Sequence, residues 1–190
     1  RQAAQMQDLV SDLTDLSQIE SGSVTLQLEE VPLAGLLGGV AKDLEGPARA
    51  KGISVALEAP ADLAVRGDRR RLAQVFRNLV DNAIKFSPAG ARVDVLAEAG
   101  QGGATALVHV VDRGIGIPAS EQAKVFQRFY RIDPSRTKTR TPGTGLGLAI
   151  VKHLLILHGG TVRLESEPLR GSRFTVTLPA APAAALREAS

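Results

Sequence analysis

The sequence contains no cysteine and no tryptophan, and only 3% of its 190 residues are aromatic. Without cysteine the chain can form neither a disulfide framework nor a thiolate metal site, which is compatible with a reducing compartment. No apolar run approaches the about 20 residues that a membrane-spanning helix needs, and no signal peptide is recognisable. The 23 Lys and Arg residues nearly balance the 20 Asp and Glu residues, so the net charge of +3 does not indicate a nucleic-acid partner.

A hydrophobic content of 44% over this length predicts one main domain with a sizeable core and an appendage. The appendage is a helix expected over residues 1–20, whose apolar residues recur every three or four positions: Met6, Leu9, Leu13 and Leu16. Ser21-Gly22 ends it. An amphipathic helix lying on the domain fits this pattern, but so narrow a seam favours half of a helical hairpin or dimer. Because Arg1 lies inside this expected helix, we expect the chain to be part of a longer protein.

Periodicity predicts a mixed sheet covered by helices on one face, an α+β sandwich. Asp68 is the expected N-cap of the longest helix, which runs to about Phe86, and Gly46-Pro47 is expected to split the first helix of the domain. The expected strands are 24–29, 53–59, 91–98, 105–112, 161–167 and 172–179, with a short extended piece at 63–66. The expected helices of the domain are 33–51, 69–86, a short helix leading from Pro118 to Phe129, and 146–158.

The longest helix carries two different stripes. At about 100° per residue, one face gathers the apolar side chains Leu72, Phe76, Leu79 and Ala83. Asn78, Asn82 and Lys85 form a polar stripe at the edge of that face. A solvated helix face is one interpretation. Because asparagine is a mediocre helix former, the other is that two amides and a cation face a phosphate ligand or a hydrated metal.

Two glycine-rich segments follow. Asp112 ends an expected strand and precedes Gly114 and Gly116, so its carboxylate can accept from an amino group while the glycines allow close backbone approach; taken alone, an ordinary turn explains it equally. Residues 143–149, GTGLGLA, open a helix after a basic loop, and free backbone N–H groups there favour an anion. A plain glycine-rich helix entry is the alternative. The loop's cations are Arg128, Arg131, Arg136, Lys138 and Arg140.

These segments, in this order, resemble the catalytic ATP-binding domain of bacterial sensor histidine kinases, a member of the superfamily that includes DNA gyrase and mismatch-repair ATPases. The similar segments are NLVDNAIKF (78–86), DRGIGIP (112–118), VFQRFYR (125–131), GTGLGLAIV (143–151), HGG (158–160) and GSRFTVTLP (171–179). The resemblance implies the Bergerat sandwich over residues 23–180, with residues 126–143 as a mobile lid and residues 181–190 as a frayed tail. Residues 1–22 resemble the end of the second helix of the dimerisation and phosphoacceptor hairpin.

The resemblance also implies roles for individual residues. Asn82 would bind Mg²⁺, Asp112 would accept the adenine amino group, and Phe86 would pack on the base. Asn78, Lys85 and Arg131 would be catalytic, the last two by addressing the phosphates, and the backbone at Leu146 and Gly147 would cap the phosphates. The expected ATP-binding set is Asn78, Asn82, Lys85, Phe86, Asp112, Gly114, Gly116, Ile117, Arg131, Thr144, Gly145, Leu146, Gly147 and Leu148.

The reaction that the resemblance implies is transfer of the ATP γ-phosphoryl group to a histidine on the missing hairpin helix, for relay to a response regulator. Hydrolysing relatives carry a glutamate at the position of Asn78, and an amide is no general base, so transfer is favoured over hydrolysis. His109, His153 and His158 have neither metal-ligand nor nucleophile context, and His158 is expected at a helix end. A homodimeric parent, with its catalytic portion in the cytoplasm, is compatible with an anchor in the inner membrane. Two alternatives stay open: an anti-sigma-type serine kinase and a nucleotide-sensing module.

Overall fold

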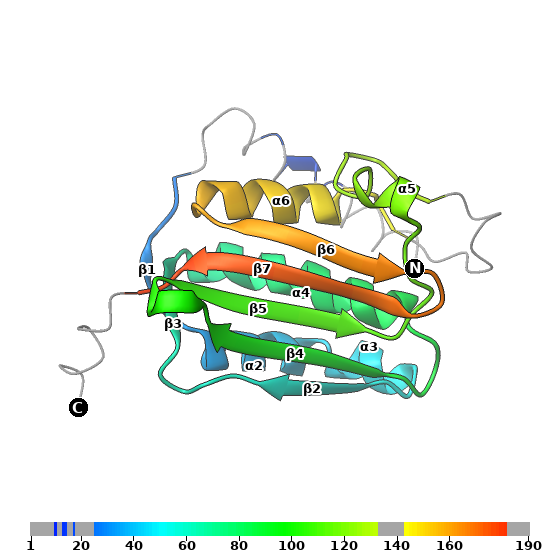
Figure 1. Ribbon diagram of the computed structural model, residues 1–190, viewed down its shortest axis with the longest axis horizontal. Coiled ribbons are helices and arrows are strands. Elements are labelled where there is room, and N and C mark those ends of the chain that lie inside the picture. Colours follow the sequence, from blue (N-terminus) through cyan, green and yellow to red (C-terminus); the bar gives the residue numbers. More distant parts are fainter. Residues whose placement is uncertain (1–9, 11–12, 15–16, 18–24, 133–142, 182–190) are drawn as a thin grey trace.

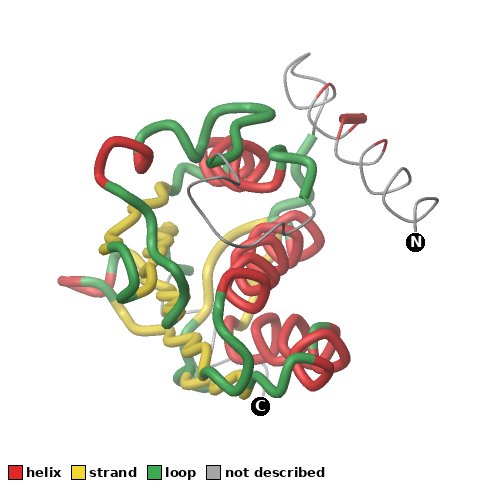
Figure 2. Tube along the Cα trace, turned by 90° about the vertical axis from the view of Figure 1, so that its right-hand side faces the viewer, coloured by secondary structure: helices red, strands yellow, loops and turns green. Residues whose placement is uncertain are grey.

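The computed structural model describes residues 10, 13–14, 17, 25–132 and 143–181. Within these ranges the chain forms a five-stranded sheet with helices packed on one side, as Figures 1 and 2 show. The described residues of the expected N-terminal helix, 10, 13, 14 and 17, are helical. The rest of that helix, most of the expected lid and the expected tail from residue 182 lie outside the described residues.

The main sheet has the strand order β2-β4-β5-β7-β6, and β1 and β3 form a separate antiparallel pair. β2 and β4 are parallel, while the other neighbours in the main sheet are antiparallel. The strands are β1 (Glu29–Pro32), β2 (Ser54–Glu58), β3 (Ala64–Gly67), β4 (Arg92–Ala99), β5 (Thr105–Asp112), β6 (Thr161–Glu167) and β7 (Gly171–Pro179).

Three long helices cover one face of the sheet, and the core lies between the two layers (Figure 2). The helices are α2 (Leu33–Asp43), α3 (Glu45–Ala50), α4 (Arg69–Phe86), α5 (Ala119–Gln122) and α6 (Gly147–Leu157), with a 3-10 turn at Gln101–Gly103. Alternate strand residues point into the core, as in β7, where Phe174, Val176 and Leu178 are buried. The apolar stripe of α4 is buried as its periodicity predicts. The predicted α+β sandwich is therefore confirmed.

Two predicted elements were wrong. The first strand is β1 at 29–32 rather than 24–29, and the described residues 25–28 form no regular structure. One backbone amide of this segment, that of Gln27, donates instead to the side chain of Asp68. The helix expected over 118–129 is only the four-residue α5, and Phe129 has a positive φ of 58° that no helix accommodates. The predicted break near Gly46-Pro47 is confirmed, since α2 and α3 are separate helices.

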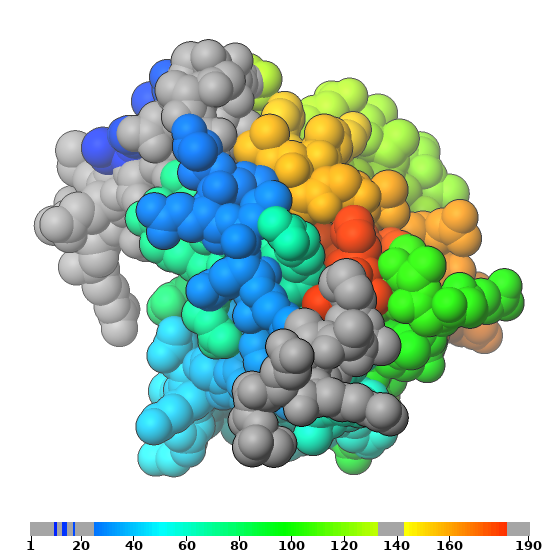
Figure 3. Space-filling model, turned by 90° about the vertical axis from the view of Figure 1, so that its left-hand side faces the viewer, coloured from blue at the N-terminus to red at the C-terminus, as the bar shows by residue number. Residues whose placement is uncertain are grey.

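Asp68 joins three segments at one end of the molecule. Its Oδ1 atom accepts from the Arg71 amide at 3.0 Å, which confirms the predicted cap of α4, and its Oδ2 atom accepts from the Gln27 amide at 3.1 Å. The amide of Asp68 donates to His158 Nε2 at 3.0 Å, and His158 Nδ1 donates to Leu154 O at 2.7 Å, so His158 lies at a helix end as expected. Burial alone would raise the pKa of Asp68, but these backbone donors hold it below its ordinary value. Figure 3 shows the chain from residue 25 through β1, in blue, lying across this end.

Candidate functional site

The expected site residues gather at the opposite end of the paired helices α4 and α6. The start of α4 is bonded to the end of α6 through Asp68 and His158. Further along α4, Asn78 is bonded to Gly147 at the start of α6, so the two helices run antiparallel. The second half of α4, the end of β5 and the beginning of α6 therefore lie at the same end of the molecule (Figure 1). The fold thus brings the polar stripe, the aspartate and the glycine-rich helix entry together.

The polar stripe of α4 lies at the edge of the core, as its periodicity predicts: Asn78, Asn82 and Lys85 are all half-buried. The Asn78 side-chain amide donates to the Gly147 carbonyl at 3.3 Å, so it orients the first residue of α6. Lys85 Nζ lies 2.5 Å from Asp81 Oδ2, one helical turn away, an ion pair that holds the ammonium beside the stripe. At the end of the helix, Phe86 leaves 40% of its surface exposed, a large apolar area available for a flat ligand.

Asp112 is a buried carboxylate at the end of β5, with only 6% of its surface exposed. Its Oδ1 atom accepts from the Gly114 amide at 2.8 Å, and Ser172, its register partner on β7, also donates to it. Burial nevertheless raises the pKa of Asp112, because these hydrogen bonds do not fully replace the water that burial removes. Such a carboxylate gains from another donor, for example the amino group of a base.

The glycines after Asp112 are required by neighbouring protein backbone. A Cβ atom on Gly114 would lie 2.5 Å from the Phe86 carbonyl oxygen, and one on Gly116 would lie 1.9 Å from the Glu167 carbonyl oxygen. Gly116 also has a φ of 66°. The loop is therefore pressed against the end of α4 on one side and the β6–β7 turn on the other. The sequence interpretation, close approach to a flat ligand, missed these protein contacts.

The second glycine-rich segment turns sharply into α6. Gly145 has a φ of 73° and passes so close to Phe129 that a Cβ atom would lie 2.9 Å from its backbone. The Leu146 amide donates to Thr144 Oγ1 at 3.2 Å, and Leu146 is fully buried. The side chain of Leu148 is half-buried against the core. Because Leu146 and Leu148 are apolar, these two residues can address an anion only through their backbone.

Several contacts around the site were not anticipated. Ile117, half-buried, donates its amide to Ser166 Oγ at 2.8 Å, and Ser166 Oγ in turn donates to the Gly171 carbonyl at 2.8 Å. Ser172 was predicted only as part of the strand 172–179, and nothing in that segment indicated Asp112 as its neighbour. Arg131 is exposed, and the residues that follow it, 133–142, lie outside the described residues. The lid therefore stays a prediction.

The described residues suit a magnesium ion that is held largely by phosphate. No group of three or more His, Asp or Glu side chains that could hold a metal occurs within residues 25–132 and 143–181. Mg²⁺ needs few protein ligands when phosphate oxygens and water complete its octahedron. The side chain of Asn82 is half-buried on α4, and in the part of the chain described it has no hydrogen-bond partner. Its amide oxygen is thus free to act as one ligand.

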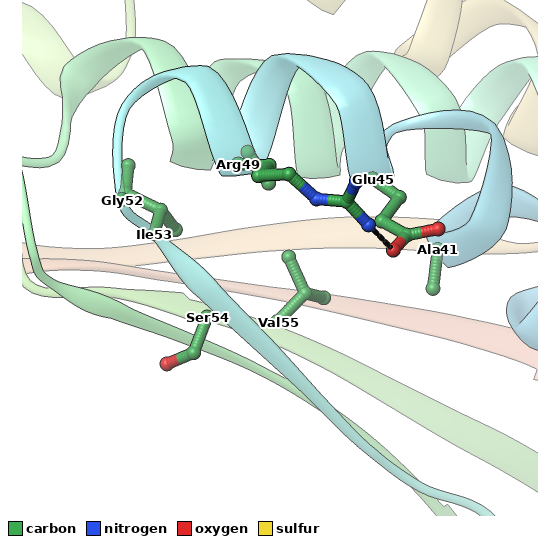
Figure 4. Close-up of a pocket in the computed structure, with 8 residues that line it drawn as sticks. Ala41, Glu45, Arg49, Gly52, Ile53, Ser54 and Val55 are labelled. Atoms are coloured by element: carbon green, nitrogen blue, oxygen red, sulfur yellow. Dashed lines mark hydrogen bonds and ion pairs between the residues drawn. The ribbon is translucent and has the colours of Figure 1, made fainter.

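An open cavity of about 450 Å³ lies elsewhere, between α3 and the edge strand β2 (Figure 4). It is lined by Ala41, Glu45, Ala48, Arg49, Gly52, Ile53, Ser54 and Val55. Glu45 forms an ion pair with Arg49 one turn along α3. None of the expected site residues lines it. It has neither the buried carboxylate nor the helix entry described above, so we do not assign the nucleotide to it.

Sequence comparisons find relatives that cover most of this chain. The sensor-like histidine kinase SenX3 of Mycobacterium tuberculosis is 38% identical over 179 residues, which are 94% of this chain and 43% of the relative. The sensor protein DivL of Caulobacter vibrioides is 39% identical over 178 residues, which are 93% of this chain and 22% of the relative. The chain thus spans less than half the length of these curated relatives. Among the described residues, no helix is long and apolar enough to cross a membrane.

Solved structures show the same fold. Full-length ShkA in complex with AMPPNP superposes with a TM-score of 0.81 at 30% identity, covering 95% of this chain and 37% of that one. The catalytic domain of the histidine kinase ThkA superposes with a TM-score of 0.70 at 30% identity, covering 80% of this chain and 95% of that one. Residues 67–182 match the family described as histidine kinase-, DNA gyrase B- and HSP90-like ATPases. The chain belongs to this ATPase family, and its relative SenX3 is a sensor-like histidine kinase.

Proposed function

We propose that this chain is the ATP-binding catalytic domain of a two-component sensor histidine kinase, and that it transfers the γ-phosphoryl group of ATP to a histidine on a dimerisation hairpin. One observation carries the proposal. A buried carboxylate, an amide stripe and a glycine-rich helix entry meet at one end of the α4–α6 pair. These are the groups that an adenine base, a hydrated cation and a phosphate chain need, in that order.

Each part of the site has a separate task in this proposal. Asp112 accepts the adenine amino group, and Phe86 packs on the base. Asn82 offers its oxygen to Mg²⁺, which would neutralise charge on the phosphates when bound. Lys85 and Arg131 address the phosphates, together with the backbone of residues 144–148. Gly114, Gly116 and Ile117 shape the loop beside the base.

The reaction is a displacement at the γ-phosphorus. A ring nitrogen of the acceptor imidazole forms a bond to phosphorus while the bond to the β–γ bridging oxygen breaks, and ADP leaves. The imidazole loses its proton to solvent. Asn78 donates its amide to Gly147, and an amide cannot take a proton from water, so the site favours transfer over hydrolysis. Catalysis then depends on positioning and charge neutralisation.

The full protein's partners follow from the same proposal: the hairpin of its own parent, a second copy in a homodimer, and a response regulator. The lid over residues 126–143 would close over the triphosphate. SenX3 is a sensor-like histidine kinase, which favours a histidine acceptor over the serine kinase alternative. A purely nucleotide-sensing module would keep the site but transfer nothing, so transfer to the hairpin separates it from a kinase.

Titration calorimetry tests the nucleotide part of the proposal. With Mg²⁺ present, we expect ATP and ADP to bind more tightly than GTP. The Asp112 carboxylate accepts from the adenine amino group but repels the carbonyl oxygen that guanine carries at that position. Omitting Mg²⁺ should weaken ATP binding, because the phosphate charge is then less neutralised. Equal affinities for ATP and GTP would contradict the assignment of Asp112.

A further inference from the structure

The ammonium group of Lys51 is bound to the end of α4. Its Nζ atom donates to the carbonyl oxygen of Ile84 at 2.9 Å and to that of Lys85 at 2.7 Å. Both are among the last four carbonyl groups of α4, which cannot accept a hydrogen bond from an amide within the helix. A cation at this position also interacts favourably with the partial negative charge of the helix C-terminus. Lys51 therefore supplies both hydrogen bonds and charge to this helix end.

The other two carbonyls of the last turn have backbone partners. The Ala83 carbonyl accepts from the Ser87 amide at 3.1 Å, and the Phe86 carbonyl accepts from the Ile115 amide at 3.4 Å. Among the described residues, Lys51 is thus the side chain that completes the end of α4. Without its ammonium group, two carbonyls of this turn would lose their partner.

Lys51 is itself fixed by the elements around it. It follows α3, where its amide donates to the Ala48 carbonyl at 3.1 Å. Its own carbonyl accepts from the Gly90 amide at 3.2 Å, in the connection that follows α4. Partial burial lowers the pKa of Lys51, as expected for an ammonium group taken partly out of water. Figure 1 shows α3 on the same side of the molecule as the end of α4. Lys51 therefore connects α3 to both sides of the turn after α4.

The end of α4 that Lys51 binds also contacts the loop of the buried aspartate. The Phe86 carbonyl accepts from Ile115, and it approaches Gly114 so closely that a Cβ atom there would lie 2.5 Å from it. The Gly114 amide in turn donates to Asp112 Oδ1 at 2.8 Å. A continuous series of contacts thus leads from the Lys51 ammonium to the Asp112 carboxylate.

We propose that Lys51 is a positioning residue for the adenine end of the site. By binding the Ile84 and Lys85 carbonyls, it holds Phe86 and the Asp112 loop at the separation that a purine base requires. Lys51 does not contact the nucleotide, and it lies outside every motif segment. This inference rests on the proposed function. A role in folding stability alone is the alternative that the experiment must exclude.

The test compares Lys51→Met, which keeps the aliphatic stem, with Lys51→Arg, which keeps a cationic donor. We expect Lys51→Met to weaken ATP and ADP binding by the same factor, on the order of tenfold, because the loss lies at the base and not at the phosphates. Its preference for ATP over GTP should fall as well. Lys51→Arg should bind ATP to within about threefold of the wild type, since a guanidinium can also donate to helix-end carbonyls.

Lys42→Met is the matched control, because Lys42 is an exposed lysine in the last turn of α2; it should bind like the wild type. Circular dichroism is used to choose a titration temperature at which every variant is folded. Wild-type affinity and ATP preference in folded Lys51→Met would overturn the inference, even if its melting temperature were lower. Should Lys51→Met not fold, equal ATP affinities of Lys51→Gln and Lys51→Arg would overturn it instead. If the wild type bound no nucleotide, the proposed function itself would fail.

Discussion

Replacing Asp112 by alanine should weaken ATP binding on the order of tenfold to a hundredfold, because a hydrogen bond to a charged group contributes roughly 1.5–3 kcal/mol. The carboxylate is buried and already accepts from Gly114, so water cannot easily take the place of the adenine amino group. Calorimetric titration with ATP in the presence of Mg²⁺ measures the loss. Asp62→Ala removes an exposed carboxylate and is the matched control, for which no loss is expected.

Asp112→Asn separates binding from stability. Burial raises the folded-state pKa of Asp112, so the ionised carboxylate reduces stability at any pH above that value. An asparagine oxygen can still accept from Gly114, so we expect this variant to unfold at higher urea concentration than the wild type at pH 7 while binding ATP more weakly. As the pH falls through the raised pKa, the wild-type carboxyl is protonated and the difference in stability should shrink. Lower stability of Asp112→Asn at neutral pH would contradict this account.

Gly116→Ala should destabilise the domain by about 3 kcal/mol or more, which is a large effect for a single methyl group. The added Cβ atom would lie 1.9 Å from the Glu167 carbonyl oxygen, and this neighbour is backbone that cannot move aside alone. The φ of 66° adds the ordinary cost of a left-handed conformation. Urea unfolding followed by circular dichroism measures the change.

Gly90→Ala is the control that isolates the clash. Gly90 has a φ of 77°, but a Cβ atom there would meet nothing within 4 Å. It should therefore cost only the conformational term of about 1–2 kcal/mol. Equal losses at the two positions would mean that the loop after Asp112 is not pressed against the β6–β7 turn.

The parts of this fold that the sequence predicts are those with strong local patterns. The period of α4 predicts both its buried face and its polar stripe, and Asp68 marks its start because a cap is a local interaction. β1 was placed wrongly because alternation over 24–29 is a local signal, whereas the observed strand is set by pairing with β3, more than 30 residues away.

The candidate site was predicted residue by residue, but its supports were not. Ser172 contacts Asp112 only because β5 and β7 are neighbours, and strand order is not visible in either segment. Lys51 reaches the end of α4 from a different helix, so no spacing within the polar stripe could indicate it. Local sequence therefore indicated the groups expected to face the nucleotide, while tertiary contacts determine what holds them.

Each of the three histidines lies in a helix, a strand or a helix end of the domain and has at least one ring nitrogen bonded within it. Both ring nitrogens of His158 are engaged, by the Asp68 amide and by the Leu154 carbonyl, and the ring is buried. His153 Nδ1 lies 2.9 Å from the Ala149 carbonyl within its own helix. His109 lies on β5 with Nδ1 3.0 Å from Thr175 Oγ1. Under the proposed function, we therefore expect the acceptor histidine to lie on another segment.

Incubation with γ-labelled ATP tests the central claim most directly. The 190-residue chain alone should remain unlabelled and should release phosphate slowly, because Asn78 provides no base for water. Adding a separate polypeptide that carries the complete dimerisation hairpin of the same parent should place acid-labile label on that hairpin. The transfer should be slow, since separate molecules lack the effective concentration of a covalent link. Acid-labile label on His109, His153 or His158, or rapid phosphate release without the hairpin, would contradict the account.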